Sequence, residues 1–174
     1  MALLKIMHYP EKVLLEAGKP LMKDEFNSDL KNLVEDMFET MYQAGGVGLA
    51  APQVAASKRL FVMDCSGGED ETQKFALINP EIIHIEGEQY GDEGCLSFPG
   101  IYTKVKREMR TVVRFQDVIG ETQEMDFEDL PARCVLHETD HCDGIVFLDK
   151  MSPLKRELSK RKIKKLQNTG KWGL

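Results

Sequence analysis

The feature that most constrains this chain is the run His137-Glu138-Thr139-Asp140-His141, an H-E-x-x-H pattern. On a helix, residues four apart lie on one face a turn apart, so both imidazoles can reach one metal ion. Glu138 follows the first histidine and can take a proton from a water molecule at that ion. The pattern predicts a helix from about Leu130 to Cys142 that ends at Gly144. The alternative is that two histidines fall at this spacing by chance.

Composition favours a single globular domain. The chain has 174 residues, of which 42 % are hydrophobic and 30 % charged, and these fractions are ordinary for such proteins. No apolar run is long enough to span a membrane, and the N-terminal segment lacks the apolar stretch of a signal peptide. The four cysteines form no C-x-x-C pair, so we expect free thiols and a cytoplasmic protein.

Charge is distributed unevenly along the sequence. Residues 153–174 contain eight Lys and Arg side chains and one acid, whereas the rest of the chain carries a net charge of −13. A basic C-terminal helix is predicted at about 153–170, with Ser152 as its N-cap and Pro153 at its first position. Two interpretations of this basic segment stay open: contact with a polyanion, or a solvated helix face without a partner.

Hydrophobic periodicity predicts the remaining elements. Asn27 or Ser28 can cap a helix that runs to about Ala44 and buries a Met- and Phe-containing stripe in the core. A short helical turn is expected within 10–18. Strand-like runs are expected at 59–64, 75–79, 82–85, 110–115 and 124–127, with the last two joined near Gly120. His84 is expected at the surface or edge of its strand.

Two glycine-rich segments lie between these elements. Gly46-Val47-Gly48-Leu49-Ala50-Ala51-Pro52-Gln53 is too small and too glycine-rich for an ordinary strand or helix. It is either a tight structural turn or a place where the backbone approaches a ligand. The second segment, 93–100, places the thiol of Cys95 in a loop beside Gly94. A nucleotide site is not expected, because neither segment has the spacing of a phosphate loop.

A catalytic metal usually keeps three protein ligands, and H-E-x-x-H supplies two. In one large group of metalloproteases the third ligand would fall at position 147, but that residue is Phe147. Downstream acids remain candidates. Cys95 is the upstream candidate, because a metal would hold it as a thiolate and Gly94 leaves room around it. The downstream acids are Asp143, Asp149 and Glu157.

Three segments together resemble the signature motifs of peptide deformylases: 46–53, 93–97 and 137–141. Their order and spacing match, and the similarity runs through most of the chain. The resemblance implies one catalytic domain over residues 1–174, of the α+β class. A mostly antiparallel β framework would surround a central helix that carries the H-E-x-x-H motif, with further helices near the N-terminus and the C-terminus.

The resemblance also implies residue roles. The metal ligands would be Cys95, His137 and His141. The ion would be Fe²⁺, with Zn²⁺, Ni²⁺ or Co²⁺ as substitutes. Glu138 would be the general base and then the acid that protonates the leaving amine. The side chain of Gln53 and the backbone N–H of Leu96 would hold the oxyanion, and Gly48 would offer its backbone to the substrate. The reaction would remove the formyl group from the N-terminal formyl-methionine of new proteins.

An unbranched apolar substrate side chain needs a pocket. Leu130, Arg133 and Cys134 lie one or two turns before His137, and Val47 and Leu96 are expected to complete the walls. Arg133 is expected to contribute its stem while its charge reaches outwards.

The chain departs from the family pattern at two positions. Leu136 stands where Gln is common, which removes a polar group near the site, and Cys142 stands where Leu is common. Cys142 is interpreted as a small buried hydrophobe, with oxidative cross-linking or metal capture as the alternative.

Two rival functions remain. A metallopeptidase would use the same helix but would leave the segments 46–53 and 93–97 unexplained. A metal-binding homologue without turnover is disfavoured, since the ligands, Glu138 and Gln53 are all present. The expected partners are N-formyl-methionyl nascent peptides, with ribosomal RNA as the polyanion for the basic C-terminal helix and no membrane.

Overall fold

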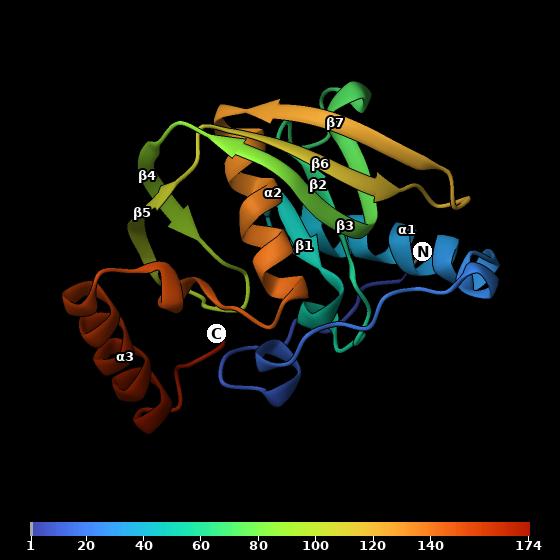
Figure 1. The fold of residues 1–174 in the computed structure, drawn as a ribbon. Coiled ribbons are helices and arrows are strands. Elements are labelled where there is room, and N and C mark those ends of the chain that lie inside the picture. The colour runs from blue at the N-terminus through green and yellow to red at the C-terminus, as the bar shows by residue number, and fades with distance from the viewer. Residues whose placement is uncertain (1) are drawn as a thin grey trace.

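The computed structural model describes residues 2–174 as one α+β domain built around helix α2 (Figure 1). A five-stranded antiparallel sheet has the order β1-β2-β3-β6-β7, and β4 and β5 form a separate two-stranded sheet. The predicted fold class, with its antiparallel framework, central helix and a helix towards each end, is confirmed. No helix within residues 2–174 is long and apolar enough to cross a lipid bilayer.

The helices are α1 (Ser28–Gln43), α2 (Asp129–Cys142) and α3 (Pro153–Asn168). The strands are β1 (Gly48–Ala50), β2 (Leu60–Asp64), β3 (Lys74–Glu86), β4 (Gln89–Gly94), β5 (Tyr102–Arg107), β6 (Arg110–Gln116) and β7 (Thr122–Glu128). The short 3-10 helices are η1 (Lys12–Leu15), η2 (Lys23–Glu25), η3 (Ala51–Val54), η4 (Glu71–Gln73) and η5 (Phe147–Lys150).

The five-stranded sheet is covered on both faces, and β2 shows why. Successive side chains of a strand point to opposite faces. Leu60 and Val62 pack with α1, whereas Phe61 and Met63 pack with α2. All of β2 is buried, which explains the unbroken apolar run at 60–63. The sheet is therefore a rigid layer that holds α2 in place from one side.

The three predicted helices are confirmed with their caps. Asn27 caps α1 by accepting from the backbone N–H of Leu30 at 3.1 Å. Ser152 caps α3 by accepting from the N–H of Lys155, and Pro153 occupies its first turn. The chain leaves α2 through Gly144, whose φ of 73° is in the left-handed region.

Three strand predictions need correction. The separate runs at 75–79 and 82–85 form one strand, β3, with register shifts between Ile78 and Glu81 and between Ile82 and His84 that interrupt the alternation. Strands β4 and β5 were not predicted, because their sequences are mostly polar or charged. The sequence predicts neither an ordinary strand nor a helix in the segment 46–53, but the segment contains strand β1 and the 3-10 helix η3.

Candidate active site

Helix α2 carries the first part of the site. His137 and His141 lie one turn apart with ring centroids 5.1 Å apart, and both are buried. The side chain of Glu138 is also buried, and its Oε1 lies 4.0 Å from His137 Nε2. Its second oxygen, Oε2, has no hydrogen-bond partner among the residues that the structure describes. Glu138 therefore presents an unpaired carboxylate oxygen beside the histidines.

Cys95 follows directly after β4 and approaches the two histidines from the opposite sheet. Its Sγ lies 3.3 Å from His141 Nε2. One ligand atom from each of Cys95, His137 and His141 lies within 4.8 Å of the others. Of the open candidates for a third ligand, the structure brings Cys95 to the histidines, and the downstream acids are not part of this group.

The three side chains fit a divalent metal ion. Two ligands of one tetrahedral ion, one sulfur and one nitrogen, lie about 3.5 Å apart, close to the observed separation of Cys95 Sγ and His141 Nε2. One thiolate with two imidazoles is a set that zinc and other transition metals accept. Such a set also leaves a coordination position open for a reactant.

A buried ion-pair network orients His137, and the sequence analysis assigned no role to its members. Glu93, on β4, accepts from His137 Nδ1 at 2.6 Å, which leaves Nε2 to face the other ligands. Glu93 also accepts two hydrogen bonds from Arg107 at 2.7 and 3.0 Å. Arg107 in turn donates to Asp140 at 2.6 Å. Glu93 lies only two residues before Cys95, which was a usable signal, whereas Arg107 had none.

Burial and charge set the protonation of these groups. Burial raises the pKa of the Glu138 carboxyl to about 7, although nearby His137 opposes the shift. Burial lowers the pKa of His141 well below its ordinary value, which favours the neutral ring that binds metals. Burial alone would raise the pKa of Glu93, but hydrogen bonds with His137 and Arg107 outweigh it and hold that pKa well below its ordinary value. Glu93 is therefore a fixed negative charge.

The segment 46–53 forms a second wall of the site. A methyl group added at Gly48 would lie 2.8 Å from both Cys134 Sγ and Glu138 Oε1, so only glycine fits there. Gln53 uses its Oε1 to accept from the N–H of Ala50 at 2.9 Å. Its Nε2 then points towards Ser97 Oγ at 3.1 Å and Cys95 Sγ at 3.6 Å. The segment therefore lies directly against Glu138 and Cys95, and close approach of its backbone to a ligand stays a prediction.

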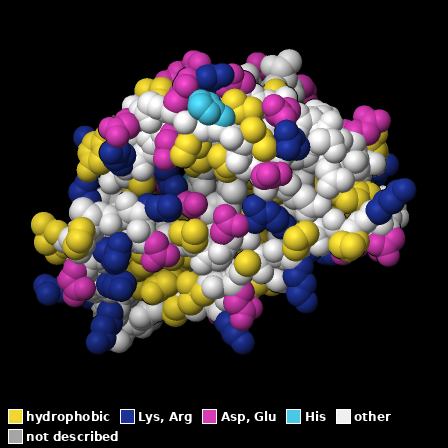
Figure 2. Space-filling view, viewed as in Figure 1, with side chains coloured by type: hydrophobic (Ala, Val, Ile, Leu, Met, Phe, Trp, Pro, Cys, Tyr) yellow, Lys and Arg dark blue, Asp and Glu magenta, His cyan; other side chains and the backbone are white. Residues whose placement is uncertain are grey.

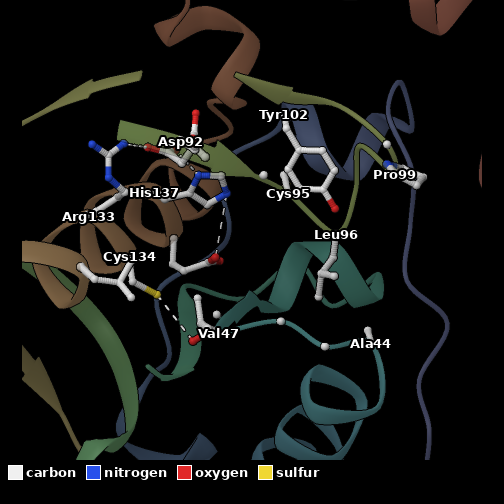
Figure 3. Close-up of a pocket in the computed structure, with 18 residues that line it drawn as sticks. Ala44, Val47, Asp92, Cys95, Leu96, Pro99, Tyr102, Arg133, Cys134 and His137 are labelled. Carbon is white, nitrogen blue, oxygen red and sulfur yellow. Dashed lines mark hydrogen bonds and ion pairs between the residues drawn. The ribbon is translucent and has the colours of Figure 1, made fainter. Parts of the chain in front are cut away.

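A cavity of about 410 Å³ opens beside these groups (Figure 3). Its lining includes every residue that we predicted for the substrate pocket: Val47, Gly48, Leu96, Leu130, Arg133 and Cys134. It also includes Tyr102, which the sequence analysis missed. Their roles in binding stay predictions, but the structure brings them to one hollow together with Cys95, His137 and Glu138.

One detail of the pocket prediction was wrong. The guanidinium of Arg133 does not reach outwards to solvent. It is buried, and its Nη1 donates to Glu93 at 2.6 Å and to the carbonyl of Val105 at 2.9 Å. The carboxylate of Glu93 attracts the guanidinium of Arg133 into the interior. The hydrophobicity of neighbouring residues in the sequence gives no information about this distant partner.

The two departures from the family pattern lie in different surroundings. Cys142 is fully buried among apolar residues, and burial raises the pKa of its thiol to about 12. Both facts favour a small hydrophobe over a reactive group. Leu136 is half-buried. Nothing in the structure explains why it replaces a polar residue.

A helix-borne pair of histidines, a cysteine ligand and an adjacent buried carboxylate together define a candidate metal-dependent hydrolase. Comparisons with known protein families, sequences and structures identify one family within this class. A family model described as polypeptide deformylase matches residues 3–157. The peptide deformylase of Acidobacterium capsulatum is 52 % identical over 167 residues, which covers 96 % of this chain and 97 % of that protein.

Solved structures agree with this result. The crystal structure of a peptide deformylase from Legionella pneumophila has a TM-score of 0.89 and 42 % identity, and the match covers 97 % of this chain and 98 % of that one. The peptide deformylase of Thermotoga maritima has a TM-score of 0.81 with 42 % identity, covering 88 % and 100 %. The chain therefore belongs to the polypeptide deformylase family, a family of metal-dependent enzymes.

Proposed function

We propose that this protein hydrolyses the formamide bond at the N-terminal formyl-methionine of newly synthesised proteins. The observation that supports it best is the convergence of three sequence segments on one cavity, from α2, from the end of β4 and from residues 46–48. Gln53 of η3 completes the group through its contact with Cys95 Sγ. Family membership supplies the substrate class. A cytoplasmic setting, where such nascent chains are made, is part of the proposal.

Each residue would have a distinct task. Cys95, His137 and His141 would hold a divalent ion, which would lower the pKa of water there and supply a nucleophile near neutral pH. Glu138 would accept the proton of the attacking water on its unpaired oxygen and then pass it to the leaving amine. These tasks need a carboxylate that is held close to the ligands and shielded from solvent, as Glu138 is.

The oxyanion that develops on the formyl oxygen would be held by two donors, the Nε2 of Gln53 and the backbone N–H of Leu96. Gln53 supports this role because its Oε1 is committed to Ala50, which fixes the direction of its amide N–H. Donors that are already oriented need no rearrangement during the reaction. Gly48 would bring its backbone against the substrate.

The methionine side chain would occupy the cavity between Val47, Leu96, Leu130 and Cys134, with the stem of Arg133 as part of the wall. Leu130 is about half exposed at the cavity. Leu130→Asp would place a charge against the apolar substrate side chain, and a raised KM is the expected result. An unchanged KM would remove Leu130 from the pocket.

The test of the reaction is anaerobic turnover of formyl-Met-Ala-Ser by the parent and by Glu138→Gln, with metal content measured on the same samples. The parent should release formate. Glu138→Gln should keep its metal and lose at least about a hundredfold in kcat, because the proton acceptor is gone. A metal-loaded parent that cleaves unformylated peptides but releases no formate would favour the metallopeptidase instead.

We propose Fe²⁺ as the ion in the cell, with Zn²⁺, Ni²⁺ and Co²⁺ as substitutes that the same ligands accept. Protein isolated anaerobically without added metal should contain mainly iron. Reconstitution of the chelator-treated protein with each ion in turn then ranks the substitutes by formate release. A predominance of zinc in the isolated protein would contradict the iron proposal.

A further proposal concerns α3 and the ribosome. Ile163 is the one buried residue within α3, so the helix packs through it and leaves most of its basic side chains exposed. Figure 2 shows Lys and Arg side chains gathered at the lower left of the molecule, where Figure 1 places α3. A row of exposed cations fits the phosphates of ribosomal RNA. The test replaces three exposed lysines of α3 by Glu, and compares them with three exposed lysines near the N-terminus. The first set is Lys160, Lys164 and Lys165, and the control set is Lys12, Lys19 and Lys23.

Co-sedimentation with ribosomes at low salt should fall for the α3 variant and should equal that of the parent for the control variant. Because both variants change the net charge equally, the comparison separates a local contact from a general charge effect. Equal co-sedimentation of all three proteins would remove the ribosome contact and leave α3 as a solvated basic face.

A further inference from the structure

A short segment near the start of the chain joins two of the three segments that form the site. The backbone N–H of Met7 donates to the carbonyl of Gln53 at 2.7 Å. Two residues later, the N–H of Tyr9 donates to the carbonyl of Ser97 at 3.0 Å. Residues 7–9, the N-terminal strap, therefore tie the backbone of Gln53 to the loop that follows β4.

That loop is fixed on both sides of Leu96. The carbonyl of Cys95 accepts from the N–H of Phe98 at 2.9 Å, which closes a turn around Leu96 and Ser97. The hydroxyl of Ser97 accepts from Gln53 Nε2 at 3.1 Å. Because Ser97 contacts the strap through its carbonyl and Gln53 through its side chain, a shift of the strap changes the positions of both proposed oxyanion donors, Gln53 and Leu96.

The other end of the chain packs against this strap. Trp172 is half-buried, and its Nε1–H donates to the carbonyl of Tyr9 at 2.7 Å. The indole also meets the ring of Phe98 edge-on, with centroids 6.4 Å apart, and Phe98 stacks on Tyr9 at 4.9 Å. Figure 1 shows the C-terminal end of the chain beside the dark-blue N-terminal segment.

A hydrogen-bonded turn after α3 places Trp172 there. Gly170 has a φ of 69°, in the left-handed region that commonly follows the last turn of a helix. The N–H groups of Lys171 and Trp172 then both donate to the carbonyl of Leu166, at 2.8 and 3.1 Å. The indole is therefore presented to the strap by a defined turn.

We propose that Trp172 is a positioning residue for the reaction. Its contacts with Tyr9 and Phe98 fix the N-terminal strap, and the strap keeps Gln53 and Leu96 in the geometry that stabilises the oxyanion. Trp172 does not line the cavity, so it acts through these neighbours. The effect on turnover rests on the proposed deformylase function, whereas the effect on the strap does not.

The alternative is that Trp172 only stabilises the fold, as part of the apolar cluster around Phe98. The two roles predict different kinetics. A displaced donor loses much of its effect on the transition state, so kcat should fall. The wall of the methionine pocket at Val47 is fixed separately, since its carbonyl accepts from the N–H of Asp64 at 2.8 Å. KM should therefore change little.

The experiment compares the parent with Trp172→Ala and Trp172→Phe. Leu174→Ala is the matched control, because Leu174 lies in the same C-terminal segment with its side chain 94 % exposed. Far-UV circular dichroism, metal content, and kcat and KM with formyl-Met-Ala-Ser are measured on each protein. Hydrogen exchange followed by mass spectrometry reports the opening of the strap amides, with a peptide from α2 as the internal reference.

Trp172→Ala should stay folded, keep its metal and lose about tenfold in kcat with little change in KM. Exchange in the strap should accelerate severalfold, and exchange in α2 should match the parent. Trp172→Phe keeps an aromatic ring near Phe98 but removes the donor to Tyr9, so it should recover part of both losses. Leu174→Ala should equal the parent in every measurement.

The proposal is overturned if folded, metal-loaded Trp172→Ala keeps the kcat of the parent, or if its strap exchanges no faster. A rise in KM as large as the fall in kcat also overturns it, because the pocket would then have changed. Should Trp172→Ala fail to fold, Trp172→Phe decides alone. Unchanged kcat and unchanged strap exchange in that variant would overturn the proposal.

Failure of the proposed function would look different. The parent would then release no formate, while hydrogen exchange would still report whether Trp172 fixes the strap. The two hypotheses can therefore be rejected separately.

Discussion

The two sides of helix α2 are held by different forces. On one side, Ala132, Val135 and Cys142 are buried against the five-stranded sheet among apolar neighbours. On the other side, His137 and Arg133 meet the carboxylate of Glu93 on the β4–β5 sheet. Figure 1 shows the helix between these two layers.

The difference separates scaffold from chemistry. Apolar packing has no direction, so the sheet side tolerates changes of shape at a cost that follows buried area. The hydrogen-bonded side depends on each partner, because a buried charge that loses its counter-ion keeps the full cost of burial. A helix that is fixed by apolar packing on one side can hold metal-ligand side chains rigidly on the other side.

The largest effect is expected where the charged side is broken. Glu93→Gln removes the carboxylate that pairs with Arg107, Arg133 and His137, whose contacts lie at 2.6 to 3.0 Å. We expect a loss of about 3–5 kcal/mol in the free energy of unfolding, because buried cations lose their counter-ion. Metal affinity should fall about 10- to 100-fold, because His137 is no longer oriented. Urea unfolding and metal titration measure the two effects; a stable variant with unchanged metal affinity would refute the division between the two sides.

A smaller effect is expected on the apolar side. Val135→Ala removes two buried carbon atoms and should lower the free energy of unfolding by about 2 kcal/mol. Because no ligand or donor changes, metal content and kcat should match the parent at a temperature where both are folded. A drop in kcat without loss of stability would show that the packed side also tunes the chemistry.

Asp64 provides a second buried carboxylate to compare with Glu93. It accepts hydrogen bonds from neutral donors, whereas Glu93 accepts from arginines. Burial alone would raise its pKa, but hydrogen bonds from Ser66, Tyr42 and the N–H of Gly68 outweigh this and hold the pKa below its ordinary value. Its contribution to stability should be full above the ordinary carboxyl pKa of about 4 and be lost as pH falls through the lower folded value. Asp64→Asn should flatten that part of the profile in urea unfolding between neutral and acidic pH. If Asp64→Asn loses as much stability between neutral and acidic pH as the parent does, the loss is not due to Asp64.

The smallest effect is expected at an exposed ion pair. Arg114 and Glu124 lie on β6 and β7 with side chains about half exposed, at 48 % and 49 %. Glu124→Gln should change the free energy of unfolding by less than about 1 kcal/mol, because solvent screens the pair. This variant is the matched control for Glu93→Gln. Similar losses in both would show that burial does not set the difference.

The sequence by itself determined the features that depend on neighbours within a few residues. Helical periodicity and caps located α1, α2 and α3, and the spacing within α2 brought His137 and His141 onto one face. The three motifs, taken in order, also led to the right family. These signals are local, because a helix closes its hydrogen bonds within four residues.

Only the tertiary structure decided what depends on distant partners. It turned the guanidinium of Arg133 inwards to Glu93, and it paired the polar strands β4 and β5. Each of these contacts joins residues that are far apart in sequence, or strands whose stability comes from the partner and not from their own composition. No local pattern records such a contact, because the pairing of distant residues exists only once the chain is packed.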